Sequence, residues 1–197
     1  MHNYDRYKYY TESKYNKKGV SWFFMKKQAD KSLIPYVKSI EKEKILEVGP
    51  GYGYYTRYLL ENGNSVTGVD INPELGNNIG VEIMKGRADQ LQEIVHDKYD
   101  RVCSFWMTEY LDEVQLKKFM MQSIALLNPE GIFATTVILN RGLGWIYIML
   151  ARIKGVRKFY CSIKRIEEML GEERKVHIVS LNTVLHIPFA VLIEVER

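Results

Sequence analysis

Residues 47–53 read EVGPGYG and place a carboxylate beside three alternating glycines. Glycine adopts positive φ angles and has no Cβ, so such a turn lets a ligand approach the main chain closely. A dinucleotide-binding turn reads GxGxxG, but Tyr54 stands here in place of the third glycine, and no Gly-Lys-Ser/Thr follows as in a phosphate-binding loop. The spacing therefore argues against NAD, FAD and nucleoside triphosphates, and leaves open another nucleoside.

A second carboxylate, Asp70, closes the apolar segment SVTGVD. In an open α/β sheet, ligands sit beyond the carboxyl ends of the strands, and an acidic residue at the second strand's end is placed to accept two ribose hydroxyls. In the alternative interpretation, residues 49–53 form only a tight turn and Asp70 caps the following helix. The strand–turn–helix context favours the nucleoside site.

Short apolar segments that alternate with helical patterns must position these residues. The sequence predicts strands over 44–49, 65–71, 81–86, 99–106, 132–139, 174–181 and 186–196. It predicts helices over 21–40 with an interruption at Pro35, and over 54–62, 88–97 and 111–127, the last closed by the NPEG turn at 128–131. Alternating strands and helices predict an α/β fold, in which a mainly parallel sheet carries helices on both faces and ends in an antiparallel pair.

The bulk composition fits one ordinary α/β domain of 197 residues with a mild net charge of +4. The charge does not demand nucleic acid, and we expect no nucleic-acid partner. Residues 1–20 are polar and tyrosine-rich, which predicts an arm or flap rather than a secretory signal. The only cysteines, Cys103 and Cys161, are too far apart for a CxxC site, so we expect no metal and a reducing, cytoplasmic location.

Taken together, EVGPGYG, VDIN and GRADQL resemble the class I S-adenosylmethionine-dependent methyltransferases, in the right order over about residues 40–140. The chain is similar to small-molecule members of that family, such as type 11/12 and quinone-biosynthesis O-methyltransferases. The resemblance implies a Rossmann-like, doubly wound, mostly parallel seven-stranded sheet with an antiparallel C-terminal hairpin, and S-adenosyl-L-methionine as cofactor. The implied cofactor-binding residues are Glu47, Gly49, Pro50, Gly51, Gly53, Asp70, Ile71, Ala88, Asp89 and Phe105.

The resemblance also assigns roles within that set. The glycine turn meets the methionine part and the sugar, Asp70 binds the ribose, and Ile71 flanks the adenine. Ala88 contacts the adenine through its backbone amide and Asp89 through its side chain, although many relatives carry an Asp where Arg87 stands. In the alternative interpretation, Asp89 is the N-cap of the helix QLQEIV, and the two roles are compatible.

The acceptor side is implied by SFWMTEYLDE, the end of the fourth predicted strand. Relatives often have Glu-His where this chain has Glu109 and Tyr110, which makes these two residues the candidates for acid–base or orienting roles. The alternative is that Tyr110 packs on the methionine chain and Glu109 is a solvated helix start. Motifs of nucleic-acid base methyltransferases, Asn/Asp-Pro-Pro-Tyr or Pro-Cys, are absent from this segment.

From Gly131 to Ile166 the sequence has no acidic residue. The basic residues within it are Arg141, Arg152, Lys154, Arg157, Lys158, Lys164 and Arg165. The part GLGWIYIML is apolar on every side of a helical wheel. In one interpretation residues 141–170 form a helical lid with basic residues at its solvated edge. In the other, residues 142–165 contact an anionic membrane surface, in which respect quinone-biosynthesis O-methyltransferases and phospholipid N-methyltransferases resemble this chain.

The sequence therefore predicts a cytoplasmic enzyme that transfers a methyl group from S-adenosylmethionine to oxygen or nitrogen of a small or lipid-like acceptor. We expect one domain with four parts: N-terminal flap and helices (1–40), cofactor-binding core (41–140), lid (141–170) and C-terminal strands (171–197). The alternatives are a nucleic-acid or protein methyltransferase, a non-catalytic nucleoside-binding protein and, third, an oxidoreductase.

Overall fold

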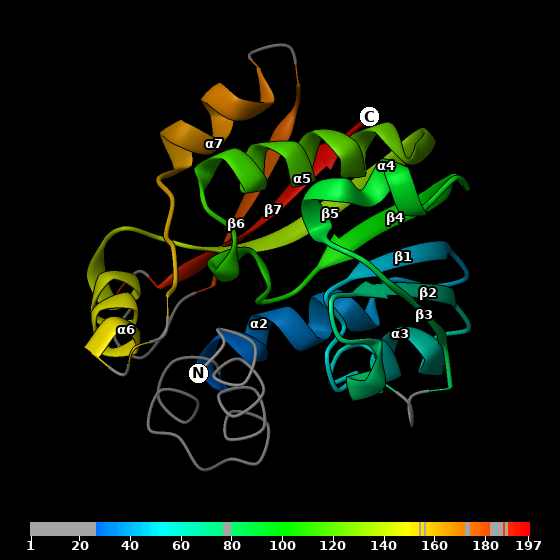
Figure 1. Ribbon diagram of the computed structural model, residues 1–197, viewed down its shortest axis with the longest axis horizontal. Helices are drawn as coiled ribbons and strands as arrows, with labels where there is room; N and C mark the ends of the chain where they lie inside the picture. The colour runs from blue at the N-terminus through cyan, green and yellow to red at the C-terminus, as the bar shows by residue number, and fades with distance from the viewer. Residues whose placement is uncertain are drawn as a thin grey trace.

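A computed structural model describes residues 27–76, 80–153, 155, 157–171, 174–181, 187 and 189–197 (Figure 1). The flap predicted for residues 1–20 lies outside these described residues. Within the described parts of the chain, no helix is both long and apolar enough to cross a membrane.

Seven strands form one sheet in the order β3-β2-β1-β4-β5-β7-β6. Their bounds are β1 (Lys44–Val48), β2 (Ser65–Asp70), β3 (Glu82–Lys85), β4 (Tyr99–Ser104), β5 (Leu127–Ile138), β6 (Val176–Leu181) and β7 (Ala190–Glu196). The neighbours from β3 to β5 pair in parallel, while β7 pairs antiparallel with both β5 and β6. The predicted fold class is confirmed, including the antiparallel C-terminal hairpin.

Helices cover both faces of this sheet. The α-helices are α2 (Lys27–Lys38), α3 (Thr56–Glu61), α4 (Leu91–Ile94), α5 (Glu113–Ala125), α6 (Gly142–Ile153) and α7 (Ile163–Leu170). The 3-10 turns are η2 (Pro73–Gly76), η3 (Ala88–Gln90) and η4 (Thr108–Tyr110). Figure 1 shows α4, α5 and α7 above the sheet and α2 and α3 below it. The helices on each face pack on the sheet around a separate apolar core. Buried side chains of α6 belong to the lower core.

The central strand β1 leads directly to the glycine turn. It lies between β2 and β4, with Glu47 in register with both Gly68 and Cys103. A parallel strand that is covered on both faces is expected to be apolar throughout. Ile45, Leu46 and Val48 follow that rule, but Glu47 is also buried. A carboxylate in this position costs free energy unless other groups stabilise it.

Three predicted element boundaries were wrong. Helix α2 continues through Pro35, because Leu33 and Val37 on either side of it are both buried and their packing outweighs one lost backbone hydrogen bond. The helix predicted over 88–97 is instead the short η3 turn followed by α4. Residues 128–131, predicted as the NPEG turn, lie inside β5. The pairing of β5 with β4 is irregular there, because Tyr99 pairs with Leu127 but Arg101 pairs with Ile132.

Candidate active site

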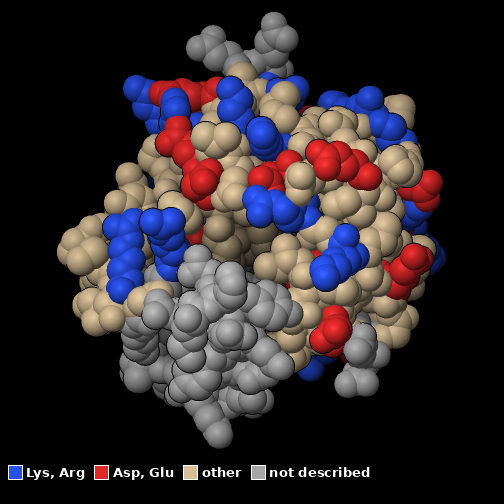
Figure 2. All heavy atoms as spheres, viewed as in Figure 1, with Lys and Arg blue, Asp and Glu red and all other residues tan. Residues whose placement is uncertain are grey.

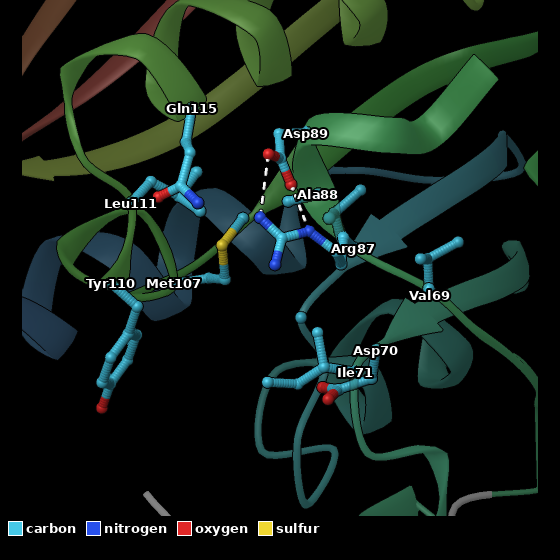
Figure 3. Close-up of a pocket in the computed structure, with 13 residues that line it drawn as sticks. Val69, Asp70, Ile71, Arg87, Ala88, Asp89, Met107, Tyr110, Leu111 and Gln115 are labelled. Carbon is cyan, nitrogen blue, oxygen red and sulfur yellow. Dashed lines mark hydrogen bonds and ion pairs between the residues drawn. The ribbon is translucent and has the colours of Figure 1, made fainter. Parts of the chain in front are cut away.

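A pocket of about 150 Å³ opens at the carboxyl edge of the parallel strands (Figure 3). The segments that follow β1, β2 and β3 meet there with η4 and the start of α5. It is lined by Val48, Gly49, Val69, Asp70, Ile71, Gly86, Arg87, Ala88, Asp89, Met107, Tyr110, Leu111 and Gln115. Ligand sites in α/β proteins are expected at this edge of the sheet.

The structure brings half of the predicted site residues into this pocket. Those that line it are Gly49, Asp70, Ile71, Ala88, Asp89 and Tyr110. Glu47, Pro50, Gly51, Gly53, Phe105 and Glu109 are not among the lining residues. Phe105 is buried in the lower core, where its ring lies 5.1 Å from that of Tyr55. Gly51 contacts the pocket indirectly, through Asp70.

The glycine turn is held tightly against its neighbours. Gly49 has φ +76°, and its amide donates to the Val69 carbonyl at 2.8 Å. A Cβ on Gly49 would lie 2.6 Å from Cγ of Met107, a pocket residue, so no side chain fits between the turn and η4. Glycine is required at this position for two reasons: it adopts the positive φ without strain, and it has no Cβ to collide with Met107.

Asp70 joins the end of β2 to the same turn. Its Oδ2 accepts from the Gly51 amide at 3.0 Å and its Oδ1 from the Asn72 amide at 2.8 Å. Burial raises the pKa of Asp70, and these backbone hydrogen bonds oppose that shift. The carboxylate therefore connects the glycine turn with Asn72, the residue just before η2. Two carboxylate oxygens offer about four acceptor sites, which leaves capacity for a ligand's hydroxyls.

Glu47 lies behind the turn and is 2% exposed. Burial, together with the nearby charge of Asp70, raises its pKa to about 7. The Thr56 hydroxyl opposes this shift by donating to Glu47 Oε2 at 2.6 Å. A buried carboxylate of this kind tolerates a cationic ligand and would repel an anionic one such as pyrophosphate.

Opposite Asp70, a pair of oppositely charged side chains forms the rim of the pocket. Arg87 donates from Nε to Asp89 Oδ1 at 2.9 Å and from its terminal nitrogen to Oδ2 at 3.0 Å (Figure 3). Burial disfavours the charged form of Asp89, but Arg87 outweighs it and the pKa of Asp89 falls. The N-cap interpretation of Asp89 is wrong, because its side chain bonds Arg87 and neither η3 nor α4 has a side-chain cap.

The turn after β4 places η4 against the neighbouring strand. Trp106 is buried with φ +63°, an unusual conformation for a residue other than glycine. Its amide donates to Thr136 Oγ1 at 2.7 Å, and the Thr108 hydroxyl donates to the Thr136 carbonyl at 2.6 Å. Two contacts to one residue of β5 therefore hold the strained turn and set the direction of η4.

Glu109 forms an ion pair inside the protein. Its Oε1 lies 2.6 Å from Nζ of Lys158, and the two side chains are 1% and 0% exposed. The Tyr147 hydroxyl donates to Glu109 Oε1 at 3.3 Å and also bonds Lys158. The Lys158 ammonium lies 4.8 Å from the ring centre of Tyr110, which lines the pocket. Glu109 is thus not a solvated helix start, and Lys158 is not at a solvated edge.

Sequence reasoning missed several of these residues. Lys158 and Tyr147 contact Glu109 from segments far along the chain. One signal for Lys158 was available: between residues 131 and 166 there is no acidic residue, so a buried cation there must pair outside its own segment. Gln115 could have been found as the partner of Asp112 in a capping box, which places it in the first turn of α5.

Comparisons with known proteins identify a family and similar folds. A family model described as a methyltransferase domain matches residues 22–176. No curated protein sequence matches the chain. A SAM-dependent methyltransferase from Archaeoglobus fulgidus has a similar fold, with a TM-score of 0.72 at 16% identity over 96% of this chain and 99% of that one.

Two further solved structures are similar. For magnesium protoporphyrin IX methyltransferase from Synechocystis with bound SAH, the TM-score is 0.64 at 16% identity, over 86% of this chain and 82% of that one. For an N-methyltransferase, NodS, from Bradyrhizobium japonicum in complex with S-adenosylhomocysteine, it is 0.63 at 14% identity, over 87% and 86%. At these identities the likeness concerns the fold.

Proposed function

The chain belongs to the methyltransferase domain family, and from this we propose that it transfers a methyl group from S-adenosylmethionine to oxygen or nitrogen of a small or lipid-like acceptor. One observation carries the proposal above the others. A buried carboxylate, Asp70, is tied to the amide of Gly51 at the mouth of a pocket built from three strand ends. This arrangement supports nucleoside binding, because the carboxylate keeps acceptor capacity for ribose hydroxyls.

S-adenosylmethionine is the cofactor, and it supplies an electrophilic methyl group on a cationic sulfonium. Asp70 accepts the ribose hydroxyls, with Ile71 beside the adenine. Ala88 and Asp89 bind the adenine edge, and the Arg87 pair fixes the orientation of the Asp89 carboxylate. Glu47 stabilises the positive charge of the cofactor from behind the glycine turn. In this assignment residues 41–140 form the cofactor-binding core of a single domain.

On the acceptor side, the candidates for acid–base or orienting roles remain Tyr110 and Glu109. Tyr110 lines the pocket and would contact the acceptor, whereas Glu109 is buried beside Lys158 and would act on it only indirectly. Lys158 and Tyr147 act through Glu109 as positioning residues, since both bond its Oε1 or each other. They reach it from α6 and the segment after it, so residues 141–170 cover the acceptor side.

We place this reaction in the cytoplasm, with contact to a membrane surface through residues 142–165. Cys103 and Cys161 are both buried free thiols, which supports a reducing compartment. The magnesium protoporphyrin and NodS enzymes suggest a small-molecule acceptor by analogy, and a porphyrin is one example of such a molecule.

Calorimetric titration with S-adenosylmethionine and S-adenosylhomocysteine tests the cofactor assignment. Asp70→Asn is expected to weaken binding by about ten- to a hundredfold, since it removes charge-assisted hydrogen bonds from a buried acceptor. Asp97→Asn is the control, because Asp97 is an exposed carboxylate that pairs with Lys44 at the far end of β1. Equal affinities of the two variants would refute the role of Asp70.

Turnover with a panel of O–H and N–H acceptors then tests the reaction. Methylation of a small or lipid-like molecule supports the proposal. Cofactor binding without turnover on any acceptor would instead indicate a non-catalytic nucleoside-binding protein. Turnover confined to RNA or protein would place the chain with the macromolecular methyltransferases.

A further inference from the structure

Helix α6 has two apolar faces, of which one is buried against the described part of the chain and the other is exposed. The inner face buries Gly144, Tyr147, Ile148 and Ala151. This spacing of three, four and seven residues is that of a single helix stripe. A Cβ on Gly144 would lie 2.2 Å from the Leu139 carbonyl oxygen, so the helix is seated closely on the end of β5. Tyr147 on this face also reaches Glu109.

The outer face of α6 consists of five large apolar residues that remain exposed. Their exposed fractions are Trp145 50%, Ile146 43%, Met149 38%, Leu150 45% and Ile153 78%. Single exposed apolar side chains are ordinary, but five on one face of a 12-residue helix form a contiguous patch. A helix with apolar residues on all sides is normally buried or in contact with lipid. The exposed face of α6 is therefore expected to bind an apolar surface outside the described structure.

The surroundings of the outer face are basic. Arg141, Arg152 and Arg157 are exposed around α6, and the chain has no acidic residue between 131 and 166. Figure 2 shows the same pattern at the left of the molecule, where Lys and Arg side chains lie beside uncharged surface over α6. The Arg152 guanidinium lies 5.8 Å from the ring centre of Tyr160, itself 39% exposed. The partner must therefore offer apolar material together with negative charge.

Charge also decides between the two simplest partners. A second copy of this chain, packed through the same face, would bring its own three arginines against these three, and like charges oppose that contact. An anionic bilayer provides hydrocarbon for the outer face and phosphate for the arginines. Tryptophan, present here as Trp145, is a residue enriched where hydrocarbon meets the headgroups.

We propose that the outer face of α6 docks on the surface of an anionic membrane. Helix α6 begins shortly after β5 ends, at the same edge of the sheet where the pocket opens, so docking presents the acceptor side of the site to the bilayer. The inference that a lipid-phase acceptor enters from there rests on the proposed function. The docking itself depends only on α6 and its charges.

Vesicle flotation with the full chain tests the docking. The probes are vesicles of phosphatidylcholine alone and of phosphatidylcholine with phosphatidylglycerol. The wild type is expected to bind the anionic vesicles and to release them at high salt. The variant Ile146→Gln/Leu150→Gln should lower the partition coefficient by more than about tenfold. Val114→Gln, at an exposed apolar position of α5, is the matched control and should bind as the wild type does.

A charge variant separates the electrostatic part of the docking. Arg152→Gln should lower partitioning by about fivefold, while Lys117→Gln, an exposed cation on α5, should leave it unchanged. Wild type that fails to bind anionic vesicles, or a double variant that binds as well as wild type, overturns the proposal. Light scattering that shows a dimer, dissociated by the double variant, would overturn it in favour of self-association.

Cofactor titration of the same variants keeps this inference distinct from the proposed function. Variants of the outer face should bind S-adenosylmethionine with wild-type affinity, because none of the changed residues lines the pocket. If the wild type binds vesicles but no cofactor, the proposed function fails and the docking surface stands. If it binds cofactor but no vesicles, only the docking surface fails.

Discussion

Replacing Glu47 by Gln is expected to remove a pH dependence of stability that this buried carboxyl creates. Burial raises the pKa of Glu47 from 4.5 to about 7. The folded chain therefore holds this proton more tightly than the unfolded chain does. The resulting stabilisation is fully present below about pH 4.5 and is lost as the pH rises through about 7. A shift of roughly 2.5 units corresponds to about 3 kcal/mol of unfolding free energy.

Urea unfolding of the wild type and Glu47→Gln, at about pH 5 and about pH 8, measures this term. The loss of unfolding free energy on going to the higher pH should be smaller in the variant by about 2.5 kcal/mol, since part of the term is already lost at about pH 5. The amide oxygen of glutamine still accepts from Thr56 Oγ1, so local packing is kept. Glu82→Gln, at an exposed carboxylate of β3, should follow the wild type. Identical pH dependence of wild type and Glu47→Gln would refute the buried titration.

The same carboxyl links cofactor binding to proton release. A cation placed near Glu47 favours its charged form, so binding of S-adenosylmethionine below about pH 7 should expel a proton. Wild-type affinity should therefore rise between about pH 5 and about pH 7, whereas that of Glu47→Gln should change less. Calorimetry in two buffers of different ionisation enthalpy counts the protons. If the wild type releases none near pH 6, Glu47 does not sit beside the cationic group, even if the stability result holds.

Two further substitutions test the packing of the site. Gly49→Ala places a Cβ 2.6 Å from Cγ of Met107, so it should weaken cofactor binding and destabilise by about 1–3 kcal/mol, measured by calorimetry and urea unfolding. Gly63→Ala is its control, with a similar φ of +75° but open space around the new Cβ, and equal effects of the two would contradict the clash. Lys158→Met leaves the Glu109 carboxylate buried without its cation and should cost about 3–5 kcal/mol in urea unfolding. Adding Glu109→Met to that variant should restore much of the loss, and a single variant as stable as the wild type would refute a buried pair.

The sequence allowed the fold class and half of the pocket to be predicted, because both depend on local pattern. Apolar strands that alternate with helices define a parallel sheet, and the carboxyl ends of such strands meet at one edge. Gly49 follows β1, Asp70 is the last residue of β2 and Ala88 follows the short connection after β3, so their meeting was predictable from order along the chain. Pro35 shows the limit of local pattern, since packing on either side kept α2 intact.

Only the tertiary structure determined which segments remote in sequence are in contact, and which side chains are buried as a result. Lys158 reaches Glu109 because the segment after α6 runs beside η4, where the Phe159 amide donates to the Glu109 carbonyl, and no local periodicity encodes that path. Burial, rather than residue type, raises the pKa of Glu47 to about 7. Helix α6 carries apolar residues on both faces, and the close approach of Gly144 to the Leu139 carbonyl determined which five large apolar residues remain exposed. Sequence pattern specifies elements through local periods, whereas partners and exposure depend on how those elements close around a shared core.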